Sequence, residues 1–186
     1  MKQGQTRAVL TICVASALAV VCASTVPASR WSGGAAGGQL EQAVSLYDQG
    51  HYAEAASILS GLDGVDAKAY LAACLARQQK FVEAETTAKA VLEQSPTHRL
   101  AVAGLGQSLV GQGKHDEAIE RLSAAITATE KAESKTDAAY AFFWRGQAHY
   151  KKGQADKMVA DFEIFLKLVP EAPEANTVRQ LLAGVR

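Results

Sequence analysis

Histidine and cysteine are the side chains of this sequence that are best suited to hold a metal ion, and their spacing decides whether they can. A zinc site on a helix needs two ligands three or four positions apart, so that both lie on one face. No two histidines have this spacing; they are His51, His98, His115 and His149. Cys74 lies in an apolar run and is predicted to be a small buried residue. The sequence therefore predicts no metal site.

The serines and glycines lack the surroundings of a catalytic or nucleotide-binding motif. The serines expected inside helices are not part of a Gly-x-Ser-x-Gly nucleophile elbow: Ser57, Ser108 and Ser123. The glycines at 104, 106, 111 and 113 are spaced somewhat like a phosphate-binding loop, but no predicted strand precedes them. The carboxylates are expected on solvent faces. We therefore predict no enzymatic activity, no cofactor and no small-molecule substrate.

Charge and hydrophobicity exclude two further classes of protein. Lysine and arginine number 19, as do aspartate and glutamate, so the net charge is zero. A nucleic-acid-binding protein needs a basic face to neutralise phosphates, so no nucleic-acid partner is expected. A hydrophobic content of 48% is too high for a disordered chain. The abundance of alanine, the best helix former, favours closely packed helices.

The first 28 residues have the layout of an export segment. Lys2 and Arg7 precede the uncharged stretch Ala8–Val26, and small residues suited to cleavage end at Ala23 or Ala28. The stretch would measure about 28 Å as a helix, so an uncleaved anchor that contacts the membrane is the alternative. A lipid-modified Cys22 is a third possibility, although the residues before it depart from a lipobox. We expect an exported protein, periplasmic, membrane-anchored or secreted, in a bacterial-type envelope.

Residues 29–38 are predicted to be a flexible linker, because four of their last six residues are glycine. Without residues 1–28 the chain keeps 17 basic residues against 19 acidic ones, a net charge of −2.

A recurring phrase divides the remaining chain into repeats. A turn residue is followed by a short helical segment that contains a small or apolar residue five positions later. The turn residues are Gly50, Gln79, Gly113 and Gly153, which lie 29, 34 and 40 residues apart. Such a period indicates a stack of helical hairpins.

These repeats resemble the tetratricopeptide repeat, a helix–turn–helix unit of 34 residues. Its small residue in the first helix matches Ala43, Ala72, Gly106 and Gly146, and the alanine of its second helix matches Ala55, Ala84 and Ala118, with Met158 in the last repeat. Its two later apolar positions match Leu59, Ala88, Leu122 and Phe162, and then Leu62, Val91, Ala125 and Phe165; its proline matches Pro96 and Pro170. The resemblance implies an all-α fold, an α-solenoid of about 3.5–4 repeats.

The repeats are expected at 36–64, 65–98, 99–132 and 139–172, within a domain of residues 39–186. The first repeat is short, and the third is followed by extra residues that either lengthen its second helix or form a longer loop. Arg145 replaces an apolar residue of the family pattern. Residues 173–184 are expected to form a capping helix, with Val178, Leu181 and Leu182 against the last repeat and Glu174 and Arg179 in water.

The resemblance also implies a binding site for a protein or peptide in the concave groove lined by the first helices. The groove positions of the family correspond to Tyr47, Arg77, Gln107, Tyr140, Phe143, Gln147, Tyr150 and Lys151. The basic residues with which some members grip acidic chaperone tails are absent. The aromatic residues near 140–150 either anchor an apolar segment of a partner, or Phe143 and Trp144 pack between repeats. The predicted function is a scaffold or adaptor of the cell envelope; the alternative is a structural subunit of an envelope assembly or secretion complex.

Overall fold

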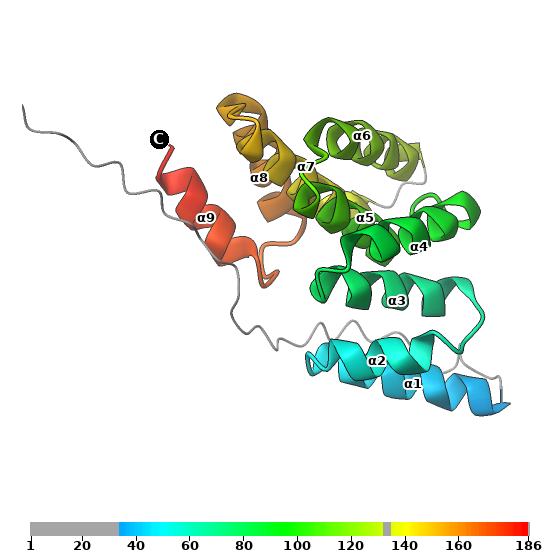
Figure 1. The fold of residues 1–186 in the computed structure, drawn as a ribbon. Helices are drawn as coiled ribbons and strands as arrows, with labels where there is room; N and C mark the ends of the chain where they lie inside the picture. Colours follow the sequence, from blue (N-terminus) through cyan, green and yellow to red (C-terminus); the bar gives the residue numbers. More distant parts are fainter. Residues whose placement is uncertain (1–33, 132–134, 186) are drawn as a thin grey trace, which may run out of the picture.

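A computed structural model describes residues 34–131 and 135–185, and every regular element within these ranges is a helix. In these two ranges, eight α-helices form four consecutive hairpins, and a ninth follows them (Figure 1). Their bounds are α1 Gly34–Asp48, α2 Tyr52–Leu59, α3 Val65–Arg77, α4 Phe81–Gln94, α5 Arg99–Gly111, α6 His115–Lys131, α7 Ala139–Lys151, α8 Ala155–Leu168 and α9 Ala175–Ala183, with a 3₁₀ turn, η2, at Lys135–Ala138.

The four hairpin turns share one backbone geometry. The turn residue has a positive φ in all four, 83° at Gly50, 63° at Gln79, 76° at Gly113 and 71° at Gly153. The next residue donates its N–H to the carbonyl five positions earlier, as in His51 to Leu46 and Lys114 to Leu109. This hydrogen bond closes the C-terminal end of the first helix in a left-handed cap, which glycine favours because it lacks a Cβ.

Prolines stop the second helix of two hairpins. α4 ends at Gln94 and α8 at Leu168, and the residues that precede Pro96 and Pro170 have left the helical conformation, each with φ of −139°. Proline disfavours helical geometry in the residue before it, which explains both ends. α6 has no proline and continues to Lys131, so the extra residues of the third repeat both lengthen this helix and add the turn η2.

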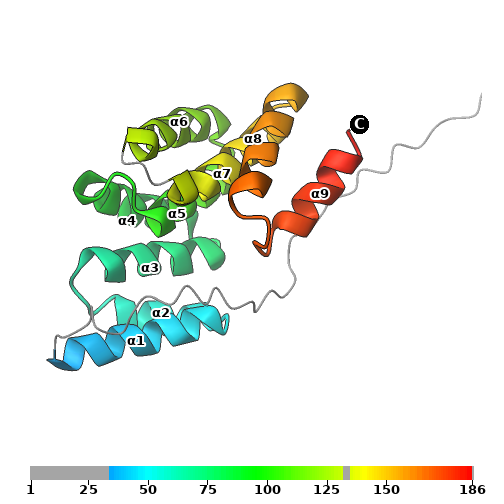
Figure 2. The ribbon, with the colours of Figure 1, turned by 180° about the vertical axis from the view of Figure 1, so that it is seen from behind.

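Each hairpin stacks on the one before it, with α5 packed on α3 and α4 and α7 packed on α5 and α6 (Figure 2). The small residues predicted at the helix crossings are buried, and two of them have no room for a side chain. A Cβ on Gly106 would lie 2.5 Å from the Cβ of Trp144, and one on Gly146 would lie 2.7 Å from the Phe162 ring. The α-solenoid is therefore as predicted, with small residues where its helices cross.

The largest apolar core belongs to the third and fourth hairpins and α9. It includes Leu122, Phe162, Phe165 and Val178, and it reaches back to Ala72 and Ala88 of the second hairpin. A separate cluster around Leu59 and Ala43 joins the first hairpin to α3. In α9, Val178 and Leu182 are buried and Leu181 packs against the core, as predicted for a cap.

The predicted linker of residues 29–38 is wrong over its second half, because α1 begins at Gly34. Each glycine costs a helix about 1 kcal/mol relative to alanine. However, α1 is already nucleated where Leu40 and Ala43 are buried, and extending an existing helix needs no new nucleus. Residues 29–33 and the predicted export segment lie outside the described residues. No described helix has the length and apolar character required to cross a membrane.

Candidate functional site

Three of the predicted groove residues come together through a carboxylate that was expected in water. Arg77 ends α3, and its guanidinium lies beside the Tyr47 hydroxyl at the end of α1, close enough to affect the pKa of that phenol. The Arg77 guanidinium also lies 3.8 Å from the carboxylate of Glu174, just before α9, and the Tyr140 hydroxyl donates a 3.2 Å hydrogen bond to the same carboxylate. Glu174 is therefore not a solvent-facing residue of the cap; only 22% of its side chain is exposed.

The arrangement of the helices explains this contact. The segment before α9 reaches toward the end of α3 in both ribbon views, so it spans from the fourth hairpin back to the second (Figures 1 and 2). We call the set Tyr47, Arg77, Tyr140 and Glu174 the arginine–tyrosine site. It combines the first helix of three hairpins with the start of the cap.

Tyrosines form the wall of this site on the side of the first hairpin. Tyr47 makes edge-on contacts with Tyr52 and Tyr70, with ring centroids 5.4 and 5.5 Å apart. Burial raises the pKa of Tyr47, and Arg77 lowers it by less, so the result is about 12. Tyr47 is thus a neutral phenol at physiological pH, and the charges of the site are those of Arg77 and Glu174.

The other predicted groove residues fall into two groups. Phe143 is only 6% exposed and packs against Phe162 and Phe165, so its prediction as a groove residue is wrong. It fills the core because the glycine at 146 lets α7 and α8 approach closely. Gln107 is half-buried and donates to the Ala76 carbonyl, which places it beside Arg77. No contact tests the groove roles of Gln147, Tyr150 and Lys151; Tyr150 is 44% exposed.

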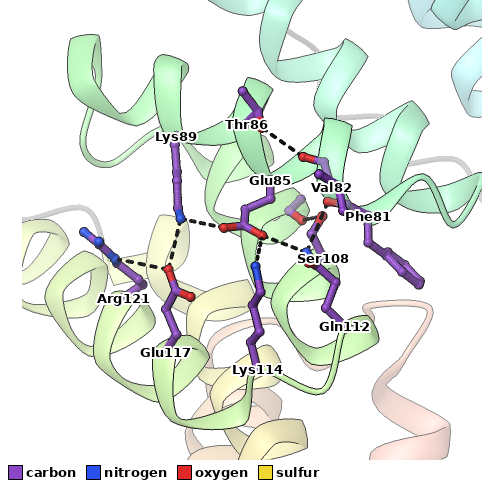
Figure 3. Close-up of polar contacts among 11 residues, drawn as sticks. Phe81, Val82, Glu85, Thr86, Lys89, Ser108, Gln112, Lys114, Glu117 and Arg121 are labelled. Atoms are coloured by element: carbon purple, nitrogen blue, oxygen red, sulfur yellow. Dashed lines mark hydrogen bonds and ion pairs between the residues drawn. The ribbon is translucent and has the colours of Figure 1, made fainter.

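A second polar cluster joins α4, α5 and α6 (Figure 3). The buried Glu85 accepts hydrogen bonds from Lys89, Lys114 and Gln112 at 2.5, 2.9 and 2.7 Å. Burial raises the pKa of Glu85, but these three donors outweigh it and lower the pKa to about 2. Glu85 therefore stays ionised at neutral pH, which suits an ion pair between helices and not a proton donor.

A third cluster explains the unusual Arg145 of the fourth repeat. Arg145 binds the buried Asp161 with two hydrogen bonds, at 2.9 and 2.6 Å, and donates a third to Ser123 on α6. The fork of the guanidinium matches a carboxylate, and the paired charge makes the burial of Asp161 tolerable. Because both oxygens of Asp161 and the hydroxyl of Ser123 are held by Arg145, this cluster joins helices and activates no nucleophile.

The prediction that carboxylates lie on solvent faces thus fails at Glu85 and Asp161. Arg145 in place of an apolar residue is a sign of this pair in the sequence, but no buried partner was predicted for it. Cys74 is buried as predicted, and burial raises the pKa of its thiol to about 12. Among the described residues, no three His, Cys, Asp or Glu side chains are grouped as metal ligands would be.

Comparison with known proteins decides the family. The model of the tetratricopeptide repeat family matches residues 40–99 and 104–173. The chain belongs to the tetratricopeptide repeat family. No curated protein matches the sequence.

Solved structures of tetratricopeptide solenoids share this fold at low sequence identity. "MamA 41-end from Desulfovibrio magneticus RS-1" has a TM-score of 0.57 and 19% identity, over 82% of this chain and 94% of that one. "MamA MSR-1 C2" has a TM-score of 0.53 and 18% identity, over 79% and 86% of the two chains. The fold is that of a protein–protein interaction module.

The tetratricopeptide repeats also form a hollow that the sequence did not predict. It has a volume of about 730 Å³ and lies between α2, α3 and α4. Its lining includes Ala53 and Ala56 of α2, Leu71 and Leu75 of α3, and Val82 of α4, whose side chain is 68% exposed. We call it the α2–α4 hollow. It is a surface of mixed polarity, built mainly by the second helices of two repeats.

Proposed function

We propose that this tetratricopeptide protein is an exported adaptor of a bacterial-type cell envelope that binds a protein or peptide partner in its concave groove. The arginine–tyrosine site is the observation that carries the proposal. Side chains from the first helices of three repeats meet there, since Arg77 and Tyr140 contact the Glu174 carboxylate and Tyr47 contacts Arg77; a single extended segment would therefore touch several repeats at once. The charged segment and uncharged stretch at residues 1–26 support export.

Photocrosslinking tests the groove. Tyr150 is replaced by p-benzoyl-L-phenylalanine, a similar aromatic shape, in the full chain expressed in its own host. The matched control carries the same group at Val82, which is more exposed and lines the α2–α4 hollow. We expect a discrete protein adduct from position 150 and none from position 82. An adduct from position 82 alone would contradict groove binding.

The α2–α4 hollow favours a second candidate, a structural subunit of an envelope assembly or secretion complex. A permanent neighbour packed on this hollow would bury the exposed Val82 together with the apolar side chains of α2 and α3 that line it. This candidate predicts adducts from position 82 and a full chain that sediments as part of a larger complex. The adaptor predicts a full chain that sediments alone when its partner is removed.

Export has its own measurement. A reporter enzyme that is active only outside the cytoplasm, fused after Arg186, is expected to be active. The mass of the mature N-terminus then separates a cleaved leader from a retained anchor. An inactive full-length fusion would contradict export, and activity unchanged by deletion of residues 1–28 would contradict export through this segment.

A further inference from the structure

We propose that the protein partner presents a carboxylate to Arg77 between Tyr47 and Tyr140, and that Glu174 occupies this place in the unbound protein. The inference rests on the proposed binding in the groove. It adds the chemistry of the partner, an aspartate or glutamate side chain or a free C-terminus, and a competitor built into the chain.

The geometry around Arg77 shows a cation whose coordination is incomplete. The guanidinium has five N–H donors in a planar fork, and a carboxylate fits that fork with two short hydrogen bonds. Asp161 binds Arg145 in this way elsewhere in the molecule, at 2.6 and 2.9 Å. Glu174 instead stays 3.8 Å from Arg77, beyond hydrogen-bond distance, and the Arg77 side chain is 42% exposed. A better-placed carboxylate would therefore gain contacts that Glu174 does not make.

Glu174 can leave without loss of the cap. α9 is held to the fourth repeat by Val178 and Leu182, which are buried, whereas Glu174 contributes one partly exposed ion pair and one long hydrogen bond. Ion pairs of this exposure stabilise a protein little. Glu174 is thus a weak internal ligand that keeps Arg77 occupied and is readily displaced.

The surroundings of Arg77 define the rest of the partner segment. Tyr47, Tyr52 and Tyr70 form an aromatic cluster beside Arg77, and Tyr140, which holds Glu174, makes edge-on contacts with the buried Phe143 and Phe165 rings. Aromatic surfaces flanking a charge favour a ligand that carries apolar side chains beside its carboxylate. The partner segment is therefore acidic at one point and apolar next to it.

Selection from a library of random 12-residue peptides tests the proposal. The bait is the full chain in a mild detergent, as wild type and as the variants Glu174→Gln, Arg77→Gln and Arg121→Gln. Arg121→Gln is the matched control, because it removes the same charge from an exposed arginine of α6. Peptides selected on Glu174→Gln are expected to be enriched in aspartate, glutamate or a free C-terminus.

Affinity measurements on the selected peptides complete the test. They should bind Glu174→Gln up to about fivefold more tightly than wild type, the ceiling for a competing exposed ion pair. They should bind Arg77→Gln at least about tenfold more weakly and Arg121→Gln unchanged. Internal glutamate-to-glutamine substitution and C-terminal amidation of the peptide separate the two sources of the carboxylate.

Two outcomes would overturn the inference, and they differ in meaning. Peptides that bind without a carboxylate, or equally well to Arg77→Gln, while Tyr140→Ala abolishes their binding would refute the carboxylate and leave groove binding intact. Peptides whose binding is insensitive to both Arg77→Gln and Tyr140→Ala would refute the inference and the proposed groove together. Circular dichroism of Tyr140→Ala is the check that its repeats stay folded.

Discussion

The first two hairpins and the last two follow one repeat pattern but fill their cores with different side chains. In α3 and α4 the buried positions are mainly alanine, including Ala69, Ala72, Ala84 and Ala88. In α7 and α8 they include Phe143, Phe162 and Phe165. The centroid of the Phe143 ring lies 6.1 Å from that of Phe162 and 5.1 Å from that of Phe165. The C-terminal half also contains the buried Arg145–Asp161 pair.

This difference predicts two levels of stability in one solenoid. A buried aromatic ring removes far more apolar area from water than a buried alanine and makes more dispersion contacts. In a repeat protein each unit depends mainly on its neighbours, so the weaker end can unfold while the other stays folded. The arginine–tyrosine site joins the two halves of the solenoid. Tyr47 and Arg77 belong to the N-terminal half, and Tyr140 and Glu174 belong to the C-terminal half.

Truncation of one core residue in each half is the strongest test of this comparison. Phe162→Ala should lower the free energy of unfolding by about 3–5 kcal/mol, because it removes a fully buried ring. Leu59→Ala should cost about 2–4 kcal/mol and loosen mainly α1 and α2. Urea unfolding gives the energies, and hydrogen exchange with mass spectrometry gives the location. If Leu59→Ala lowers protection equally in α7 and α8, the halves are not separate units.

Two glycines on α5 allow the packing against α7 to be compared with the packing against α3. Gly106 faces α7, where an added Cβ would lie 2.5 Å from Trp144, so Gly106→Ala should destabilise the protein by about 1–3 kcal/mol. Gly104 faces α3, where the nearest atom of Ala72 would be 3.5 Å away, an ordinary contact. Gly104→Ala should be neutral or stabilise by up to about 1 kcal/mol, because alanine is the better helix former. Melting temperatures of the two variants measure the difference; equal effects would show that α5 has the same space on both sides.

The stacking register was predictable because it depends on short-range patterns. Small residues at helix crossings, such as Gly106, and glycines at turns, such as Gly113, recur at a nearly constant period. The position of Glu174 was not predictable, because it depends on the angles between the second, third and fourth hairpins, which bring the chain before α9 back to α3. The burial of Glu85 was missed for a similar reason, since its donors Gln112 and Lys114 lie 27 and 29 residues away.

Low pH should destabilise the junction of the two halves by protonating Glu85, which links α4 to α5 and α6. Its carboxyl has a pKa of about 2 in the folded protein against an ordinary value of 4.5. This stabilisation is complete above about pH 4.5 and is lost as the pH falls toward 2, because the unfolded chain takes up the proton first. Its partners Lys89 and Lys114 are partly exposed, so the loss should be only about 1–2 kcal/mol.

Chemical denaturation between pH 2.5 and 5 measures this contribution. Glu85→Gln should have a lower stability at pH 5 and a flatter pH dependence than wild type. Glu83→Gln, an exposed position of the same helix, is the matched control and should leave the pH dependence unchanged. A wild-type slope that survives in Glu85→Gln would assign the acid sensitivity to another carboxylate.

The smallest expected effect lies at the turn of the second hairpin, where the N-terminal half departs from the glycine of the other three turns. Gln79 has φ of 63°, a left-handed conformation that costs a residue with a Cβ about 1–2 kcal/mol. Glycine removes this strain but adds freedom to the unfolded chain, so Gln79→Gly should stabilise by about 0.5–1 kcal/mol. The reverse change, Gly113→Gln, has open space around it and should cost a similar amount through backbone strain alone. Hydrogen exchange should show more protection of α3 and α4 in Gln79→Gly and no change in α7 and α8, which would make the strained turn one reason why the N-terminal half is less stable. A loss of stability would show instead that the Gln79 side chain stabilises the turn.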